Sequence, residues 1–161
     1  MTNHWIPRSK WDALIRGENC PLCDTVRGDG ADNEFNYFIT DLSMGRLVLD
    51  KNQYVKGYSL LICFKHVREP YELPQDEQER FWDDMVTAGL ALEKVFRSDK
   101  MNFQILGNAV PHLHCHLVPR YYGDEGGNRP TDPHTETFTL KPEEYAERVI
   151  KIREMLAIVR V

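Results

Sequence analysis

Apolar and polar residues recur along this chain with two different spacings, and each spacing predicts a different kind of element. Five short runs rich in β-branched and aromatic residues lie between turn-forming residues, which predicts strands at 36–40, 46–50, 58–64, 101–106 and 112–119. After Pro74, apolar residues fall on one helical stripe at positions 81, 85, 88, 92, 95 and 96, which predicts a long helix. Pro142 opens a second amphipathic pattern that extends to about Ala157.

The order of these segments predicts an α+β fold, in which about five strands form an antiparallel sheet beside a long helix and a C-terminal helix. Only the short segment Gly107–Pro111 separates the last two predicted strands, which favours an antiparallel pair. The 161 residues contain no internal repeat and no linker-like stretch, so we expect a single domain. It would consist of an N-terminal arm (1–33), a core (34–120) and a tail with its helix (121–161).

Charge and cysteine content narrow the classes of function. A formal net charge of -5 and a pI near 5.7 argue against a nucleic-acid partner or an anionic membrane surface. No apolar run at the N-terminus indicates an export signal and no stretch approaches a membrane span, so we expect a cytoplasmic protein. In that reducing compartment the four cysteines do not predict disulfides, and the Cys20-Pro-Leu-Cys23 pair indicates a metal or redox motif.

Three of the six histidines alternate within His112-Leu-His-Cys-His-Leu-Val. In a strand His112, His114 and His116 would share one face, and the residues between them would face the core. So many groups that titrate near neutral pH indicate a reactive site or a metal site rather than a half-exposed strand with incidental histidines. Two chemistries stay open. Either the imidazoles ligate a catalytic metal, or one imidazole is a nucleophile whose neighbour protonates the leaving group.

A family resemblance separates these chemistries. Residues 107–120 resemble the His-φ-His-φ-His-φ-φ signature, with φ hydrophobic, of the histidine triad superfamily of nucleotide hydrolases and transferases. Residues 49–50 and 57–66 look like the nucleotide-binding strands of that family, and the order of elements matches as well. The resemblance covers about residues 34–120, and it implies the antiparallel fold of the superfamily.

The resemblance also implies roles for the three histidines. His114 matches the nucleophile that attacks the α-phosphorus and forms a nucleotidyl-histidine intermediate, which water then cleaves. His116 matches the histidine that contacts the scissile phosphate and helps the leaving group depart, and His112 matches the one that supports the site from behind. The expected substrates are nucleoside phosphoramidates or dinucleoside polyphosphates, and catalysis would need no metal or other cofactor.

Substrate-binding residues follow from the same resemblance. Asp50 matches the residue that hydrogen-bonds the ribose hydroxyls, although a strand-end turn would also suit a carboxylate. Gly107 and Asn108 match a phosphate-binding loop that is longer in many members, so Asn108 must stand in for the usual amide. Arg120 either contacts substrate or closes a strand end onto a carboxylate or carbonyl. Tyr58 stands where the family usually has a histidine, so any work of that histidine is absent or altered.

The cysteine pair matches the zinc-bearing branch of the superfamily, in which a Cys-x-x-Cys joins a strand-end histidine and the first triad histidine. By this resemblance Cys20, Cys23, His66 and His112 would form a closed, structural zinc site. The alternatives are a reduced, metal-free cysteine pair and a His66 that only caps its strand.

Two other functions stay open beside the expected enzyme. One is a non-catalytic nucleotide-binding module, which would not require a nucleophile, and the other is a hydrolase that uses the triad as metal ligands. The family commonly forms homodimers through the long helix and an adjoining strand, so a homodimer is expected here. His4 and His134 lie in polar segments, and the sequence gives no reason to assign either a role.

Overall fold

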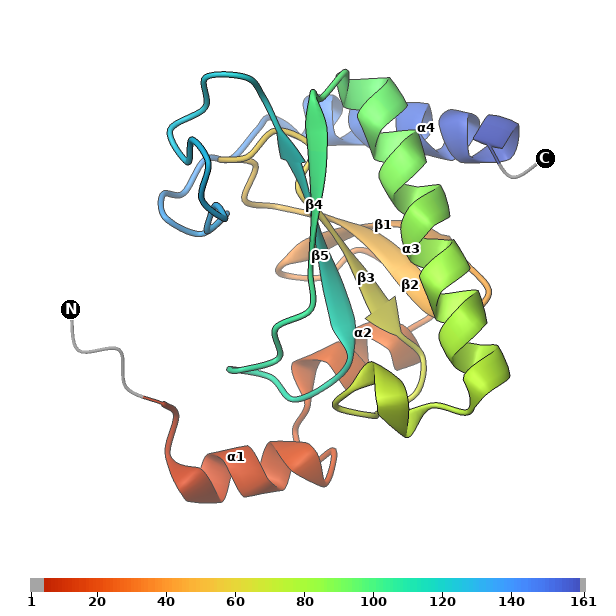
Figure 1. The fold of residues 1–161 in the computed structure, drawn as a ribbon, viewed down its shortest axis with the longest axis vertical. Helices are drawn as coiled ribbons and strands as arrows, with labels where there is room; N and C mark the ends of the chain where they lie inside the picture. The colour runs from red at the N-terminus through yellow and green to blue at the C-terminus, as the bar shows by residue number, and fades with distance from the viewer. Residues whose placement is uncertain (1–4, 160–161) are drawn as a thin grey trace.

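The computed structural model of the chain describes residues 5–159 and contains a five-stranded antiparallel sheet flanked by helices (Figure 1). In chain order the elements are α1 (Arg8–Ile15), α2 (Pro21–Arg27), β1 (Asn36–Asp41), β2 (Gly45–Asp50), β3 (Ser59–Cys63), the 3-10 helix η1 (Pro70–Glu72), α3 (Gln75–Phe96), β4 (Lys100–Gln104), β5 (His114–Arg120) and α4 (Pro142–Val159). The strand order is β1-β2-β3-β5-β4, with every neighbouring pair antiparallel. The predicted α+β fold, with its long helix and its C-terminal helix, is confirmed. Within residues 5–159, no helix is both long and apolar enough to cross a membrane.

Helices α3 and α4 pack against each other and form one continuous core with the sheet. Alternate strand residues supply the sheet side of this core, among them Leu61 of β3 and Leu117 of β5, which are fully buried. Leu92 of α3 and Ile152 of α4 complete the same cluster. Burial of each such aliphatic side chain contributes about 1.5–3 kcal/mol. This layer therefore fixes which strand residues face the opposite side of the sheet.

The opposite side carries α2, which belongs to the N-terminal arm. Leu22 and Val26 of α2 pack against apolar residues of β2, β3 and β5. In Figure 1 the arm lies at the lower end of the sheet, where β3 ends and β5 begins. The sequence pattern does not predict α2, because its seven residues are too few to show a helical period; Pro21 at its first position is the available signal.

Strand β5 begins two residues later than the predicted 112–119. The backbone before it follows the turn after β3 instead of the regular ladder. The Leu113 N–H donates to the Val67 carbonyl at 2.6 Å, and the Leu113 carbonyl accepts from the Cys63 N–H at 3.0 Å. The connection from β4 is correspondingly longer than the predicted turn at Gly107–Pro111 and covers residues 105–113. The antiparallel pairing of β4 with β5 is confirmed.

Candidate functional site

His114 and His116 lie on β5 and face away from the α3 core, to which Cys115 between them belongs. The Nδ1 atom of His114 lies 2.6 Å from the backbone oxygen of His112. A carbonyl oxygen only accepts hydrogen bonds, so Nδ1 carries the proton and Nε2 has a free lone pair. Burial lowers the pKa of His114, which keeps its ring neutral. A neutral imidazole with a fixed tautomer and a free lone pair is able to act as a nucleophile.

His116 forms a pair with His114, with the two Nε2 atoms 3.1 Å apart. Because His114 Nε2 has the lone pair, His116 Nε2 is the donor in this contact. The lone pair of His116 is then on Nδ1, which accepts a hydrogen bond from the Tyr58 hydroxyl at 2.6 Å. Burial, reinforced by His114, lowers the pKa of His116 to about 3. The site therefore holds two neutral imidazoles of different tautomers.

Two residues that the sequence did not assign complete this network. Tyr58 is fully buried, and its hydroxyl also contacts Nε2 of His134 at 3.2 Å. His134 comes from the tail, and its ring is exposed on the other side. Nothing in its polar, non-periodic segment could have indicated this contact, whereas the Tyr58 position was marked by its departure from the family pattern. His4 lies outside the described residues.

Asn52 holds the tail segment that carries His134. Its side-chain amide donates to the backbone carbonyls of Pro133 at 3.2 Å and Glu136 at 2.7 Å. Its Oδ1 atom accepts from the Phe138 N–H at 2.9 Å. Hydrogen bonds on both sides of His134 thus fix the course of a segment that has no regular secondary structure. In Figure 1 the loop that precedes α4 lies at the opposite end of the sheet from α1.

Asp50 ends β2 and is buried near the same network. Its Oδ1 atom accepts from the Asn52 N–H at 2.7 Å, which is the turn contact considered as the alternative. Burial raises the pKa of Asp50, while this hydrogen bond and the nearby His134 act in the opposite direction. A carboxylate accepts about four hydrogen bonds, so the turn contact leaves capacity for the ribose hydroxyls. The ribose contact itself stays a prediction.

The four predicted metal ligands, Cys20, Cys23, His66 and His112, come together in the structure, and their ligand atoms all lie within 4.8 Å of one another. The Cys23 Sγ atom is 3.2 Å from His66 Nδ1 and 3.4 Å from His112 Nδ1. The two Nδ1 atoms are 3.2 Å apart, and Cys20 Sγ is 3.6 Å from His112 Nδ1. The nitrogen and sulfur ligands of a tetrahedral zinc ion would be about 3.3–3.8 Å apart. These four donor distances are therefore close to those of a zinc site.

Hydrogen bonds outside this cluster set the tautomers of both histidines. His112 Nε2 donates to the Cys63 carbonyl at 2.8 Å, and His66 Nε2 donates to the Ile15 carbonyl at 3.1 Å. Each ring consequently directs an Nδ1 lone pair into the cluster. Burial lowers the pKa of His112 to about 4, so its imidazole is in the neutral form that binds metals. The residues present fit a closed Cys₂His₂ site.

Comparison with known proteins identifies the family. The model of the histidine triad (HIT) domain matches residues 36–123, more than half of the chain. The chain belongs to the HIT family. It is 24% identical over 145 residues to Protein hit of Bacillus subtilis (strain 168), a match that covers 87% of this chain and 96% of that protein.

Solved structures agree with this assignment. A histidine triad protein from Marinobacter aquaeolei VT8 superposes with a TM-score of 0.70 at 26% identity, covering 77% of this chain and 90% of that one. A Zn-bound histidine triad family protein from Mycobacterium smegmatis has a TM-score of 0.62 at 22% identity, covering 88% of this chain and 96% of that one. These neighbours confirm the HIT fold.

In this HIT protein the Arg120 guanidinium makes five hydrogen bonds within the chain. Two go to the Asp124 carboxylate at 2.6 Å each, and one goes to Asn102 Oδ1 at 2.9 Å. The other two go to the backbone oxygens of Arg129 at 2.8 Å and Gly127 at 3.1 Å. These contacts match the alternative role of Arg120, in which its guanidinium closes a strand end onto a carboxylate and backbone carbonyls. All five guanidinium N–H groups are engaged in them, and a substrate contact of Arg120 stays a prediction.

The loop before the triad of this HIT protein contains the other predicted substrate contacts. Gly107 has a φ of 74°, a conformation that favours glycine, and Asn108 is exposed. Phosphate binding by this loop stays a prediction.

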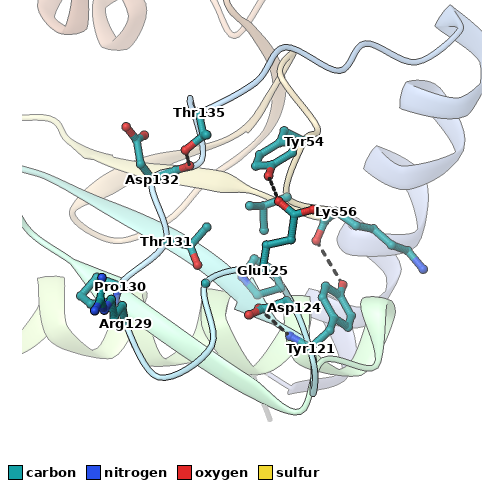
Figure 2. A pocket seen from close by; sticks show the side chains of 13 residues that line it. Tyr54, Lys56, Tyr121, Asp124, Glu125, Arg129, Pro130, Thr131, Asp132 and Thr135 are labelled. Carbon is teal, nitrogen blue, oxygen red and sulfur yellow. Dashed lines mark hydrogen bonds between the residues drawn. The ribbon is translucent and has the colours of Figure 1, made fainter. Parts of the chain in front are cut away.

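A cavity of about 770 Å³ lies between the loop after β2 and the tail (Figure 2). Tyr54 and Lys56 line one side, and tail residues that include Thr131 and Asp132 line the other. The Tyr54 hydroxyl donates to the Glu125 carboxylate at 2.9 Å. The cavity adjoins the segment that carries His134, but none of the three triad histidines lines it.

Proposed function

We propose that this HIT protein is a hydrolase or nucleotidyltransferase that cleaves at the α-phosphate of a nucleoside phosphoramidate or a dinucleoside polyphosphate. One observation carries the proposal: a lone pair on His114 Nε2 lies 3.1 Å from an N–H on His116 Nε2. Nucleophilic attack needs the lone pair, and protonation of the leaving group needs the N–H. Nucleotide binding alone requires neither, which favours an enzyme over a nucleotide-binding module.

The proposed reaction has two half-reactions. First, His114 Nε2 forms a bond to the α-phosphorus, the bond from phosphorus to the leaving nitrogen or oxygen breaks, and the leaving atom takes the proton of His116 Nε2. Water, or another acceptor in a transferase, then attacks the phosphorus, gives a proton back to His116 and releases His114 Nε2 as the bond between phosphorus and nitrogen breaks. Asp50 would accept hydrogen bonds from the ribose hydroxyls. Backbone N–H groups of the loop at Gly107 and Asn108 would stabilise charge on the phosphoryl oxygens.

The decisive experiment measures nucleoside monophosphate release from an adenosine phosphoramidate and several dinucleoside polyphosphates. Wild type should turn over at least one of them, and His114→Ala should lose about 10³-fold or more of that kcat because the nucleophile is gone. Glu143→Gln, an exposed change on the first turn of α4, is the matched control and should keep full activity. Activity retained by His114→Ala would contradict the mechanism. A wild type that binds nucleotides without turning any over would favour the binding module.

We also propose that Cys20, Cys23, His66 and His112 hold a structural zinc ion. The spacing and tautomers of the donors support it, as does the Zn-bound relative from Mycobacterium smegmatis. Four protein ligands would leave no position for substrate, so the ion would be structural. The backbone oxygen of His112 also orients His114, so the ion would brace the strand end that holds the nucleophile.

We further propose a homodimer formed through α3 and β4. Trp82, Val86 and Leu90 follow one another at four-residue spacing on α3 and are exposed. The edge strand β4 and the residue just after it add two more exposed apolar side chains, Phe103 and Ile105. A contiguous apolar surface beside an unpaired sheet edge supports an interface between two copies of the chain.

A further inference from the structure

The hydrogen bonds of the triad continue through Tyr58 to the tail with a single consistent direction. His114 Nδ1 donates to a carbonyl, which leaves its Nε2 to accept from His116 Nε2. His116 Nδ1 must then accept from the Tyr58 hydroxyl, whose only proton is used in that bond. The Tyr58 oxygen in turn accepts from His134 Nε2. From His114 Nδ1 to His134 Nε2 each donor has an acceptor, and this series of hydrogen bonds ends at an exposed imidazole.

The proposed reaction places a difficult demand on His116. It must release a proton to the leaving group in the first half-reaction and take one from water in the second. Its environment opposes the charged form, because burial and the neighbouring His114 lower the pKa of His116 to about 3. At neutral pH a charged His116 is therefore scarce. A neutral His116 that gave up its Nε2 proton without replacement would become an imidazolate, which is far less stable still.

We infer that Tyr58 and His134 form a proton relay that switches His116 between its two neutral tautomers during the reaction. The inference rests on the proposed function. As the leaving group takes the Nε2 proton of His116, the Tyr58 proton moves to His116 Nδ1, the Nε2 proton of His134 moves to Tyr58, and His134 Nδ1 takes a proton from the solvent. His116 then has its lone pair on Nε2, ready to accept a proton from the attacking water. Transfer back through Tyr58 returns a proton to His134 Nε2 while His134 Nδ1 releases its proton to the solvent, so the cycle closes with one water consumed and one protonated leaving group released.

His134 is suited to exchange protons with the solvent, because it is exposed. An imidazole can take up a proton on one nitrogen while its other nitrogen releases one. Within residues 5–159, the charged and titratable groups that face His134 are Tyr58, His116 and two carboxylates, Asp50 and Asp132. The Asp132 carboxylate also accepts from the His134 backbone N–H at 2.8 Å. Tyr58 stays protonated between transfers because burial raises its pKa.

The relay is tested with two substrates that share a nucleoside and differ in leaving group. One is a phosphoramidate with an alkylamine leaving group, which must be protonated, and the other is a p-nitrophenyl ester, whose leaving group departs as an anion. Tyr58→Phe and His134→Gln should each lower the single-turnover rate of amine release from the phosphoramidate by about 10²-fold, since general-acid catalysis contributes that much. Both should change the single-turnover rate of p-nitrophenolate release from the ester by less than about threefold, because that leaving group takes no proton from His116. Glu136→Gln, two residues from His134 with an exposed side chain, is the matched control for the tail.

The possible outcomes are distinct. An equal loss in the rate of leaving-group release from both substrates would mean that Tyr58 and His134 only position the site, and an unchanged rate with both would exclude them from leaving-group protonation; either result overturns the relay. Failure of the proposed function would show differently, as a wild type that turns over neither substrate.

A spectroscopic measurement tests the relay without turnover. Imidazole nitrogen chemical shifts of free wild type should show His116 protonated on Nε2, with Nδ1 accepting a hydrogen bond. Tyr58→Phe should remove the shift due to that hydrogen bond while His114 keeps its Nδ1 proton. A wild-type His116 protonated on Nδ1 would overturn the relay, because Tyr58 could then not be its donor.

Discussion

At the scale of single residues, Asp50 offers a test that separates binding from catalysis. Its carboxylate is buried at the end of β2 and would accept hydrogen bonds from the ribose without touching the reacting phosphorus. Hydrogen bonds to a charged group contribute about 1.5–3 kcal/mol, so Asp50→Ala should raise KM roughly 10- to 100-fold with little change in kcat. Burial raises the pKa of Asp50, so acidification should raise the wild-type KM sooner than it would for an ordinary aspartate. An unchanged KM in steady-state assays would remove the ribose assignment.

Residues also differ in how far the sequence could predict them. His114, His116 and the Cys20–Cys23 pair sit in short motifs whose spacing is visible in the chain itself. The place of His66 beside the cysteines could be predicted only through the family resemblance, because the fold brings His66 to Cys23 from 43 residues away. Neither a motif nor the family resemblance indicated the contact between His134 and Tyr58. It depends on Asn52 hydrogen bonds to backbone groups, and any sequence could present those backbone groups.

At the scale of elements, the N-terminal arm is held to the sheet by the proposed zinc site rather than by a large core of its own. Within residues 5–159, the cluster around Cys20 and Cys23 contains one other buried apolar side chain, Leu14 of α1. Cys20→Ser should therefore release the metal and lower the melting temperature by about 5–10 °C, as expected for a loss of about 2–3 kcal/mol in a chain of this size. Metal analysis and thermal unfolding check both effects. Cys115→Ala, a buried cysteine outside the cluster, should keep the metal, and a metal-free wild type would contradict the site outright.

The same scale shows why some elements were predictable and others were not. The strands and α3 bury one face each, so their apolar residues recur every two positions in a strand and every 3.6 positions in the helix. This period is visible in the sequence. Helix α2 is too short to carry such a period. The segment before His114 looks like strand because its residues alternate, yet hydrogen bonds to the turn after β3 take it out of the ladder. Alternation records which side chains face inward, and it does not fix where regular pairing begins.

At the scale of the whole molecule, the proposed dimer gives the exposed side of α3 a function. Exposed fractions of 62% for Trp82, 48% for Val86 and 39% for Leu90 are costly for apolar side chains in a monomer. Helix α3 lies close to β4 here, since a Cβ on Gly89 would come within 2.5 Å of the Phe103 ring. The helix and the sheet edge therefore form one surface.

Val86 is the central residue of that surface, so a charge introduced there should act on association and not on folding. Val86→Glu would bury an unpaired carboxylate in the interface, and we expect it to weaken dimerisation by about 10²-fold or more. Sedimentation should then give the mass of one 18.8 kDa chain, whereas wild type should give twice that mass. Ile158→Glu makes the same kind of change at a 64% exposed position of α4 and should leave the dimer intact. A wild type that sediments as a monomer at high concentration would refute the interface.

Because the site network runs through β5, Tyr58 and the tail of a single chain, Val86→Glu should also keep turnover, which tests whether each protomer carries a complete site.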